Sequence, residues 1–177
     1  MSLVERRYAA SLIELADDKT SYEQFYQDLK LAADTIHRNE ELEAFVHDDH
    51  IDSRKKKKVV SAIFQGKIRQ ELVNFLNLLI DKNRIGYLDS IIEQFRLLAD
   101  QKKNILNITI ASAFPVNDLQ CQKLKEKYKK KYKASDVRIH LLEDKSLLGG
   151  IKVIIGDTVI DGTVKNRLEE LKKSLLQ

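Results

Sequence analysis

The feature that most restricts this fold is the placement of its glycines and its single proline. The 177-residue chain has only six glycines, and four of them lie within residues 147–168. Because glycine and proline interrupt helices and mark turns, the first hundred residues offer few places for the chain to change structure. We therefore expect a mainly α protein with short connections, and a different kind of structure where the glycines gather.

Apolar side chains recur at helical spacing throughout the first hundred residues. The second such segment, for example, places Phe25, Leu29 and Ile36 on one face. This period predicts six helices, and short connections between amphipathic helices predict a compact six-helix bundle over residues 1–104. Four of the expected helices cover about residues 3–17, 21–38, 40–46 and 67–82. The fourth in chain order starts near Asp52 or Ser53, either of which can cap it, and is expected to bury Val59, Val60, Ile63 and Phe64; the sixth carries Leu88, Ile91, Ile92, Phe95 and Leu98.

The period changes at about Asn104, where apolar and polar residues begin to alternate as in a strand. Residues 105–177 then predict a small α/β domain in the order strand, helix, three strands, helix. The charge supports two domains, because residues 1–104 carry 17 Lys/Arg and 18 Asp/Glu whereas residues 105–177 carry 14 and 9. The last helix has an apolar face on which Leu171 and Leu175 are expected to be core.

The glycine-rich stretch raises the possibility of a nucleotide site. A phosphate-binding loop places its glycines after a strand and at the start of a helix. Here Gly149 and Gly150 precede a predicted strand, and neither G-x-x-x-x-G-K-[ST] nor G-x-G-x-x-G occurs. The order of elements argues against a phosphate cradle, and no cofactor is expected.

The same stretch instead predicts a β-hairpin. Gly156 and Asp157 lie between two β-branched runs, which is typical of a two-residue turn with glycine at positive φ. Gly162 would let the chain leave the second strand, and Thr163 would cap the last helix. The predicted register pairs Ile155 with Thr158, Ile154 with Val159, Val153 with Ile160 and Lys152 with Asp161, and the residues that shape it are Gly149, Gly150, Gly156, Asp157, Asp161 and Gly162.

No cluster in the sequence has the pattern of a catalytic or metal site. The segment HDDH, His47–His50, resembles metal ligands, but it ends a short helix, where solvated polar loops are common. His140 has no activated serine or cysteine with it. Cys121 is the only cysteine, which excludes an internal disulfide and a cysteine-based zinc site and fits a reducing, cytoplasmic compartment. We expect no enzyme activity and no bound metal.

Residues 123–133 hold seven lysines and two tyrosines, a composition that also fits a nucleic-acid-binding helix. Leu124, Tyr128 and Tyr132 share one helical face, however, which places the tyrosines in the core and the lysines on a solvated outer face. The run RKKKK, residues 54–58, is likewise expected to be solvated. A nucleic-acid-binding module remains the alternative function.

Two helices carry more apolar surface than a bundle core normally uses. The helix over residues 3–17 has a stripe of large residues beside a stripe of small ones, and the helix over residues 67–82 has apolar residues flanking its main face. The excess is either ordinary core or a groove for a partner's amphipathic helix. The residues that would line such a groove are Tyr8, Ala9, Leu12, Ile13, Ala16, Val73, Asn77 and Ile80.

Three segments resemble a known family, the delta subunit of bacterial F-type ATP synthases, whose mitochondrial relative is the oligomycin-sensitivity-conferring protein. RYAASL (Arg7–Leu12) is similar to the family's opening motif, and VNFLNLLIDKNRIGYLDSIIEQF (Val73–Phe95) is similar to its fifth and sixth helices. LLGGIKVIIGDTVIDGTVKNRLEEL (Leu147–Leu171) resembles its C-terminal signature, the most specific of the three. One departure is HDDHIDS, where family members often have a proline.

The resemblance implies a non-catalytic adaptor of the peripheral stalk. Its N-terminal domain would sit on the alpha/beta head and bind the N-terminal helix of an alpha subunit in a groove between the first and fifth helices. Its C-terminal domain would bind the b subunits, so that the head does not rotate during proton- or sodium-driven ATP synthesis. The resemblance implies no cofactor and no nucleic acid, and membrane association only through the complex, at the cytoplasmic face of the cell membrane.

Overall fold

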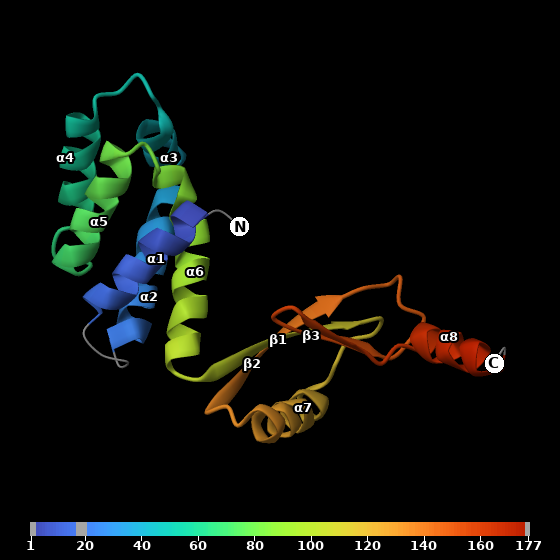
Figure 1. The fold of residues 1–177 in the computed structure, drawn as a ribbon. Helices are drawn as coiled ribbons and strands as arrows, with labels where there is room; N and C mark the ends of the chain where they lie inside the picture. Colours follow the sequence, from blue (N-terminus) through green and yellow to red (C-terminus); the bar gives the residue numbers. More distant parts are fainter. Residues whose placement is uncertain (1–2, 17–20, 176–177) are drawn as a thin grey trace. The chain divides into compact units, whose positions relative to one another are not determined.

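The computed structural model describes residues 3–16 and 21–175 and divides into two compact units, Met1–Ala99 (unit 1) and Asp100–Gln177 (unit 2) (Figure 1). The division falls within the sixth helix, a few residues before the boundary expected from the change of period. The buried Asp100 accounts for this position, because it accepts hydrogen bonds from Arg138 at 2.9 and 3.0 Å and from Asn107 at 3.0 Å, and both donors lie on strands of unit 2.

Over its described residues, unit 1 is a bundle of six α-helices, and the fold class is confirmed as mainly α. A short 3₁₀ turn, η1 (Ile85–Tyr87), leads into the last of them. Large apolar side chains such as Leu12, Phe64 and Phe95 fill its core. The helices are α1 (Leu3–Leu15), α2 (Ser21–His37), α3 (Glu40–His47), α4 (Ser53–Phe64), α5 (Gln70–Asp81) and α6 (Leu88–Lys102).

Helix α5 begins later than the apolar pattern predicts, at Gln70 rather than residue 67. Gly66 has a φ of +76°, and the amides of Lys67 and Ile68 both donate to the carbonyl of Phe64. The end of α4 is thus closed by a glycine turn that uses the residues expected to start α5.

The lysine run at the start of α4 is not uniformly solvated. Asp52 caps the helix by accepting from the amide of Arg54 at 2.7 Å. Lys56 is only 5% exposed, and its ammonium donates to the carbonyl of Val46 at 2.9 Å. Val46 lies in the last turn of α3, where carbonyls lack helical partners and a cation is favourable. One lysine of the run therefore ties α4 to the end of α3.

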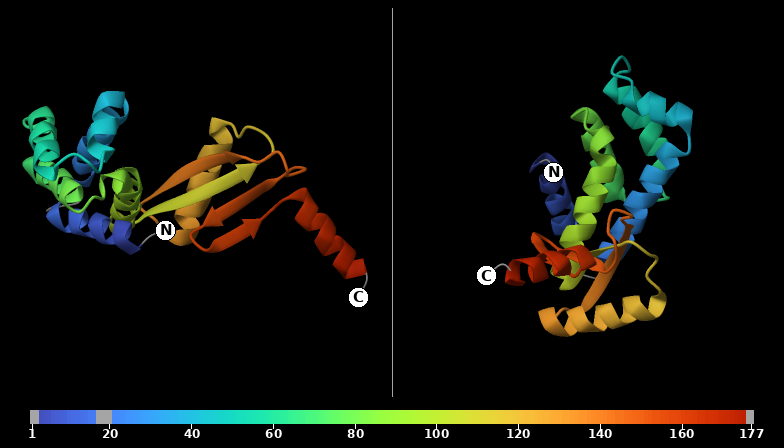
Figure 2. Two further views of the ribbon diagram at one scale, coloured as in Figure 1. Left: turned by 90° about the horizontal axis from the view of Figure 1, so that it is seen from above. Right: turned by 90° about the vertical axis from the view of Figure 1, so that its right-hand side faces the viewer.

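Unit 2 is a four-stranded sheet with one helix packed on it. The strand order is β2-β1-β3-β4, with β1 and β2 parallel and the other pairs antiparallel. Helix α7 connects β1 to β2 and covers one face of the sheet, where Tyr128 joins Ile108, Ile110 and Val153 in a small core (Figure 2). The elements are β1 (Ile105–Ser112), α7 (Asp118–Tyr132), β2 (Asp136–Glu143), β3 (Ile151–Ile155), β4 (Thr158–Asp161) and α8 (Val164–Leu175).

The hairpin of β3 and β4 has the predicted register. Gly156 and Asp157 form its turn, and Gly156 has a φ of +55°. The paired residues are Lys152 with Asp161, Val153 with Ile160, Ile154 with Val159 and Ile155 with Thr158, as the turn residues indicated. A local turn signal was therefore sufficient to set the pairing of the two strands.

Gly149, Gly150 and Gly162 let the segment before β3 approach the segment after β4 closely. A Cβ at Gly150, whose φ is +83°, would lie 2.5 Å from the carbonyl oxygen of Gly162. The amide of Val164 donates to the carbonyl of Gly149 at 3.0 Å. Asp161 accepts from the amide of Thr163 at 2.9 Å, and this bonding to Thr163 lowers the pKa of the Asp161 carboxyl. These contacts hold the chain where it leaves β4.

Thr163 caps α8 as predicted, accepting from the amide of Asn166 at 3.2 Å. The expectation that Leu171 is core is wrong, however, because Leu171 is 58% exposed, and Val164 and Leu168 on the same face are 45% and 56% exposed. The turn after β4 directs α8 away from the sheet, so no sheet surface lies against this face (Figure 2). The side chain of Leu175 lies outside the described part of the structure.

Tyr132 is also more open than the helical pattern predicts. It is 39% exposed and stacks on the buried Tyr128, with 6.2 Å between the ring centroids. Tyr128 occupies the place next to the sheet, and Tyr132 covers it one turn later from the solvent side. Among residues 3–16 and 21–175, none of the helices has the length and apolar character needed to cross a lipid bilayer.

Candidate partner-binding surface

The stripe of small residues on α1 lies inside the bundle. Ala9, Ile13 and Ala16 are buried beside Leu12, so they cannot line an open groove in this conformation. Their small size lets α1 pack closely on its neighbours, which is the ordinary-core alternative for a wide apolar arc. The groove predicted from these residues is corrected accordingly, although Tyr8, at the edge of the same helix, stays partly exposed.

The flanking stripe of α5 faces α4 rather than α1. Asn77 donates from its side-chain amide to the hydroxyl of Ser61 on α4, at 3.0 Å. Val73 and Ile80 lie one turn to either side of Asn77 and are buried. These three residues were expected to form the wall opposite α1. The helical pattern places the three residues on one side of α5, with the apolar Val73 and Ile80 buried, but it does not say which neighbouring helix they meet.

One contact between α1 and α5 is made by two aromatic rings. Tyr8 and Phe75 pack edge to face, with 6.0 Å between their centroids and an interplanar angle of 72°. Offset and edge-to-face rings are the favourable arrangements for aromatic pairs. Phe75 is buried, whereas Tyr8 is half-buried. The solvent side of this pair is therefore the seam between the two helices.

Apolar side chains extend along this seam on both helices. Leu15 lies two turns after Tyr8 on α1 and is 50% exposed, and Leu78 lies one turn after Phe75 on α5 and is 43% exposed. The helical period places Val4 and Ser11 on the same side of α1 as Tyr8. We call this surface the Tyr8 face; it consists of Val4, Tyr8, Ser11 and Leu15 of α1 with Leu78 of α5.

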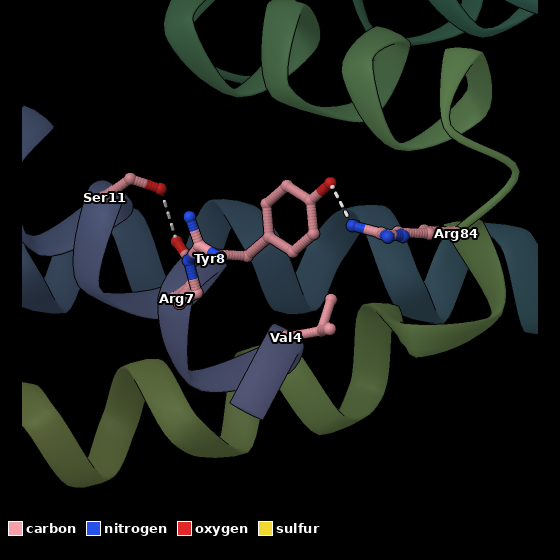
Figure 3. A pocket seen from close by; sticks show the side chains of 5 residues that line it. All are labelled: Val4, Arg7, Tyr8, Ser11 and Arg84. Atoms are coloured by element: carbon pink, nitrogen blue, oxygen red, sulfur yellow. Dashed lines mark hydrogen bonds between the residues drawn. The ribbon is translucent and has the colours of Figure 1, made fainter. Parts of the chain in front are cut away.

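Arg84 closes one end of the Tyr8 face. Its guanidinium donates to the Tyr8 hydroxyl at 3.0 Å and lies 5.7 Å from the centre of the Tyr8 ring (Figure 3). The end of α5 positions it, because Asn83 has a φ of +52° and the Arg84 amide donates back to the carbonyl of Leu79 at 2.7 Å. A hollow of about 400 Å³ opens here, lined by Val4, Arg7, Tyr8, Ser11 and Arg84.

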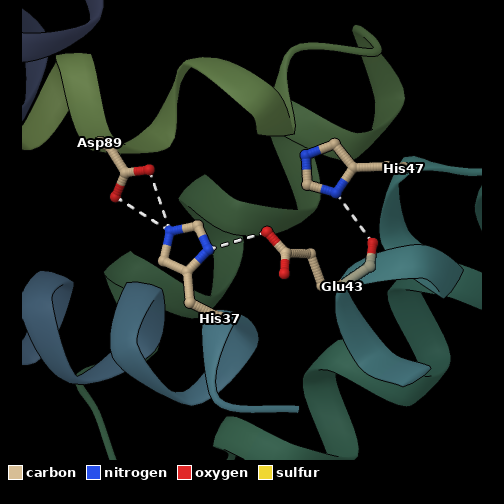
Figure 4. A network of polar contacts seen from close by, with 4 residues as sticks. All are labelled: His37, Glu43, His47 and Asp89. Atoms are coloured by element: carbon tan, nitrogen blue, oxygen red, sulfur yellow. Dashed lines mark hydrogen bonds and ion pairs between the residues drawn. The ribbon is translucent and has the colours of Figure 1, made fainter. Parts of the chain in front are cut away.

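A second polar group, missed by the sequence analysis, joins three helices of unit 1. His37, at the end of α2, lies 3.0 Å from Glu43 of α3 and 2.9 Å from Asp89 of α6 (Figure 4). Hydrogen bonding to Glu43, together with the nearby Asp89, raises the pKa of His37 although burial acts against it. Asp89 lies 52 residues from His37, so no local pattern could have revealed this group.

The HDDH segment is held by contacts within the protein. The amide of His50 donates to Asp48 at 2.9 Å, and the side chain of Asn83 donates to Asp49 at 2.9 Å. The ring of His47 is hydrogen-bonded to the carbonyl of Glu43. Over residues 3–16 and 21–175, no group of three or more histidine, cysteine or acidic side chains is arranged to hold a metal ion.

The lysines of α7 form an exposed outer face, as predicted. Lys127 lies over the ring of Tyr128 and Lys131 over that of Tyr132, at 5.9 and 5.6 Å. The aromatic rings are thus occupied by neighbouring side chains and by each other rather than displayed as open stacking platforms. His140 is exposed on β2, and Cys121 is a half-buried free thiol on α7.

Comparison with known proteins identifies relatives over the whole length of the chain. The model of the family described as ATP synthase delta (OSCP) subunit matches residues 4–175. The chain is 45% identical to ATP synthase subunit delta of Acetivibrio thermocellus, covering 100% of this chain and 99% of that one. It is 36% identical to ATP synthase subunit delta of Chloroherpeton thalassium, covering 99% and 95%.

The fold is shared with a solved structure. A chain of the Toxoplasma gondii mitochondrial ATP synthase hexamer superposes with a TM-score of 0.70 at 22% identity, covering 100% of this chain and 99% of that one. The comparisons support a peripheral-stalk role and give no support to the nucleic-acid alternative. The full-length matches therefore establish that the chain belongs to the ATP synthase delta (OSCP) subunit family, as a structural rather than a catalytic subunit.

Proposed function

We propose that this chain joins the catalytic head of an F-type ATP synthase to the b subunits of its peripheral stalk. Unit 1 binds the N-terminal helix of an alpha subunit, and unit 2 binds the b subunits. The connection keeps the alpha/beta head from turning with the central shaft while ion flow drives synthesis. The chain reaches the cytoplasmic face of the cell membrane only as part of the complex.

The observation that carries the proposal for unit 1 is the Tyr8 face. Two half-exposed leucines, Leu15 and Leu78, lie along the seam between α1 and α5 on either side of the half-buried Tyr8. An amphipathic helix binds by laying its apolar face into such a seam between two helices. The groove between the first and fifth helices, which the family resemblance implied, is thus assigned to the Tyr8 face and not to the small-residue stripe.

The support for unit 2 is the apolar face of α8. Val164, Leu168 and Leu171 recur at helical spacing and are about half exposed. A stripe of this kind is buried when a second helix packs against it. Because the b subunits must be held by the part of the chain that does not bind the head, we assign them to α8.

Co-purification with a tagged full-length chain tests both assignments. Leu78→Glu is expected to lose the alpha subunit and keep the b subunits, whereas Leu168→Glu is expected to do the reverse. Each change places a charge in an apolar contact that must be desolvated on binding. Leu31→Glu is the matched control, because Leu31 is 46% exposed on α2, a helix that contributes no residue to the Tyr8 face.

Retention of the alpha subunit by Leu78→Glu, or its equal loss by Leu31→Glu, would reject the Tyr8 face. Retention of the b subunits by Leu168→Glu would reject α8. Circular dichroism of each variant confirms that the fold is intact, which is expected since all three leucines are exposed.

A further inference from the structure

The hollow at the end of the Tyr8 face is lined by an unusual set of polar groups. Two of its five lining residues, Arg7 and Arg84, are cations, and none of the five is acidic. We call this hollow the arginine pocket; its residues are Val4, Arg7, Tyr8, Ser11 and Arg84. The two arginines approach it from different elements, Arg7 from α1 and Arg84 from the segment after α5 (Figure 3).

The hydrogen bonds already made in the pocket leave mainly donors free. The Tyr8 hydroxyl accepts from Arg84, so its own proton is available to a further acceptor. Ser11 donates its hydroxyl proton to the backbone carbonyl of Tyr8 at 2.8 Å. A guanidinium has five N–H groups, and the one contact from Arg84 to Tyr8 leaves the others for a ligand. The pocket therefore favours a group that accepts several hydrogen bonds.

The described part of the chain does not neutralise either arginine. Within residues 3–16 and 21–175, no carboxylate forms an ion pair with Arg7 or Arg84. Arg84 is nevertheless held in place by the Tyr8 hydroxyl and by stacking over its ring. A guanidinium fixed in this way loses little freedom when it binds a carboxylate with two parallel hydrogen bonds.

We propose that the arginine pocket receives a carboxylate of the helix that docks on the Tyr8 face, and that this ion pair sets the register of the helix. The inference rests on the proposed binding of the alpha N-terminal helix to unit 1. It specifies the chemistry of that partner: an amphipathic helix with an aspartate or glutamate beside its apolar stripe, at the end that lies against Arg84. The apolar seam supplies contact area, and the arginine pocket selects the orientation.

Calorimetric titration of the full-length chain tests this inference. The probe is a synthetic peptide of the N-terminal segment of the alpha subunit from the same organism, with versions in which each acidic residue is replaced in turn by its amide. Arg84→Gln is expected to weaken binding of the unmodified peptide by about tenfold or more, and Arg7→Gln by about threefold. Arg6→Gln is the matched control, because Arg6 is exposed on the opposite side of α1 and is expected to change affinity by less than about twofold.

One amide version of the peptide is expected to bind the wild-type chain about tenfold more weakly. Its affinity is expected to be the same for the wild-type chain and for Arg84→Gln. This loss of sensitivity separates a direct ion pair from a general effect of charge. Tyr8→Phe is a further control, since it removes the hydroxyl but leaves the charge of Arg84, and it is expected to keep the preference for the acidic peptide.

Three results would overturn the inference: equal affinity for all amide versions, equal losses for Arg6→Gln and Arg84→Gln, or binding of the peptide that does not weaken between 50 and 300 mM salt. In each of these the peptide still binds, and the proposed function stands. Absence of any binding to the wild-type chain would overturn both the inference and the proposed role of unit 1.

Discussion

Helices α1 and α8 both carry an apolar stripe along one side, but the protein covers most of the first and leaves the second open. On α1 the wider arc, including Ala9 and Ile13, is buried among the other helices of the bundle. On α8 the narrower stripe, including Leu168 and Leu171, is more than half exposed. The width of a helix's apolar arc therefore does not decide whether that arc is exposed to solvent in the folded chain.

The difference comes from what the chain places beside each helix. The other helices of unit 1 bury Ala9, Leu12 and Ile13 of α1, whereas Tyr8 and Leu15 at the edge of this apolar arc reach solvent. Unit 2 has a thin core under α7, and α8 leaves the sheet directly after β4. Partner binding is thus expected at an edge in unit 1 and over a whole helical face in unit 2.

The largest expected difference between the two helices is in stability. Leu12→Ala should lower the free energy of unfolding by about 2–5 kcal/mol, because the residue is fully buried and its removal leaves a cavity. Leu168→Ala should change it by less than about 0.5 kcal/mol, as for other exposed positions. Urea unfolding of the full chain, followed by circular dichroism, measures both. Similar losses for the two variants would mean that the apolar face of α8 is packed against the rest of unit 2.

A smaller effect is expected from the glycines that set the exit of α8. Gly150→Ala should cost about 1–3 kcal/mol from the clash of its Cβ with the Gly162 carbonyl, in addition to about 1 kcal/mol for positive φ. Gly156→Ala is the matched control, because its φ is also positive but nothing lies within 4 Å of the added Cβ. The difference between the two melting temperatures isolates the clash, and equal temperatures would refute it.

The smallest effect concerns the contact that holds α2, α3 and α6 together in unit 1. Because the pKa of His37 is raised in the folded chain, its charged form adds stability below about pH 6.5, which is lost as the pH rises through the folded value. At 44% exposure of the His37 side chain, a contribution in the range of surface ion pairs, about 0.2–1 kcal/mol, is expected. His37→Gln should therefore destabilise unit 1 at pH 5.5 and be nearly neutral at pH 8.5. The same loss at both values would show that charge is not involved.

Local signals were sufficient to predict much of the fold. The turn at Gly156 and Asp157 set the register of β3 and β4, and Thr163 capped α8 as its position indicated. The helices of unit 1 followed from the spacing of their apolar residues, except that the turn at Gly66 delayed the start of α5. In each of these cases the deciding contacts lie within a few residues of one another.

The proposed partner surface could not be predicted in the same way, because it depends on contacts between distant segments. Asn77 faces α4 through Ser61, and Tyr8 meets Arg84 from 76 positions away. The periodicity of α1 identifies both stripes as apolar but does not show which one the other helices cover. Of the candidate residues on α1, Tyr8 stays partly exposed, whereas the alanines beside it are buried and not exposed as a groove would require.

The most direct test of the central claim is to block the Tyr8 face without touching the core. Ser11 and Ala10 are adjacent exposed residues of α1, and only Ser11 lines the face. With the alpha N-terminal peptide in calorimetry, we predict that Ser11→Trp weakens binding at least about tenfold, whereas Ala10→Trp changes it by less than about twofold. Equal affinities for the two variants, or a greater loss for Ala10→Trp, would contradict the assignment of the alpha-binding surface to the Tyr8 face.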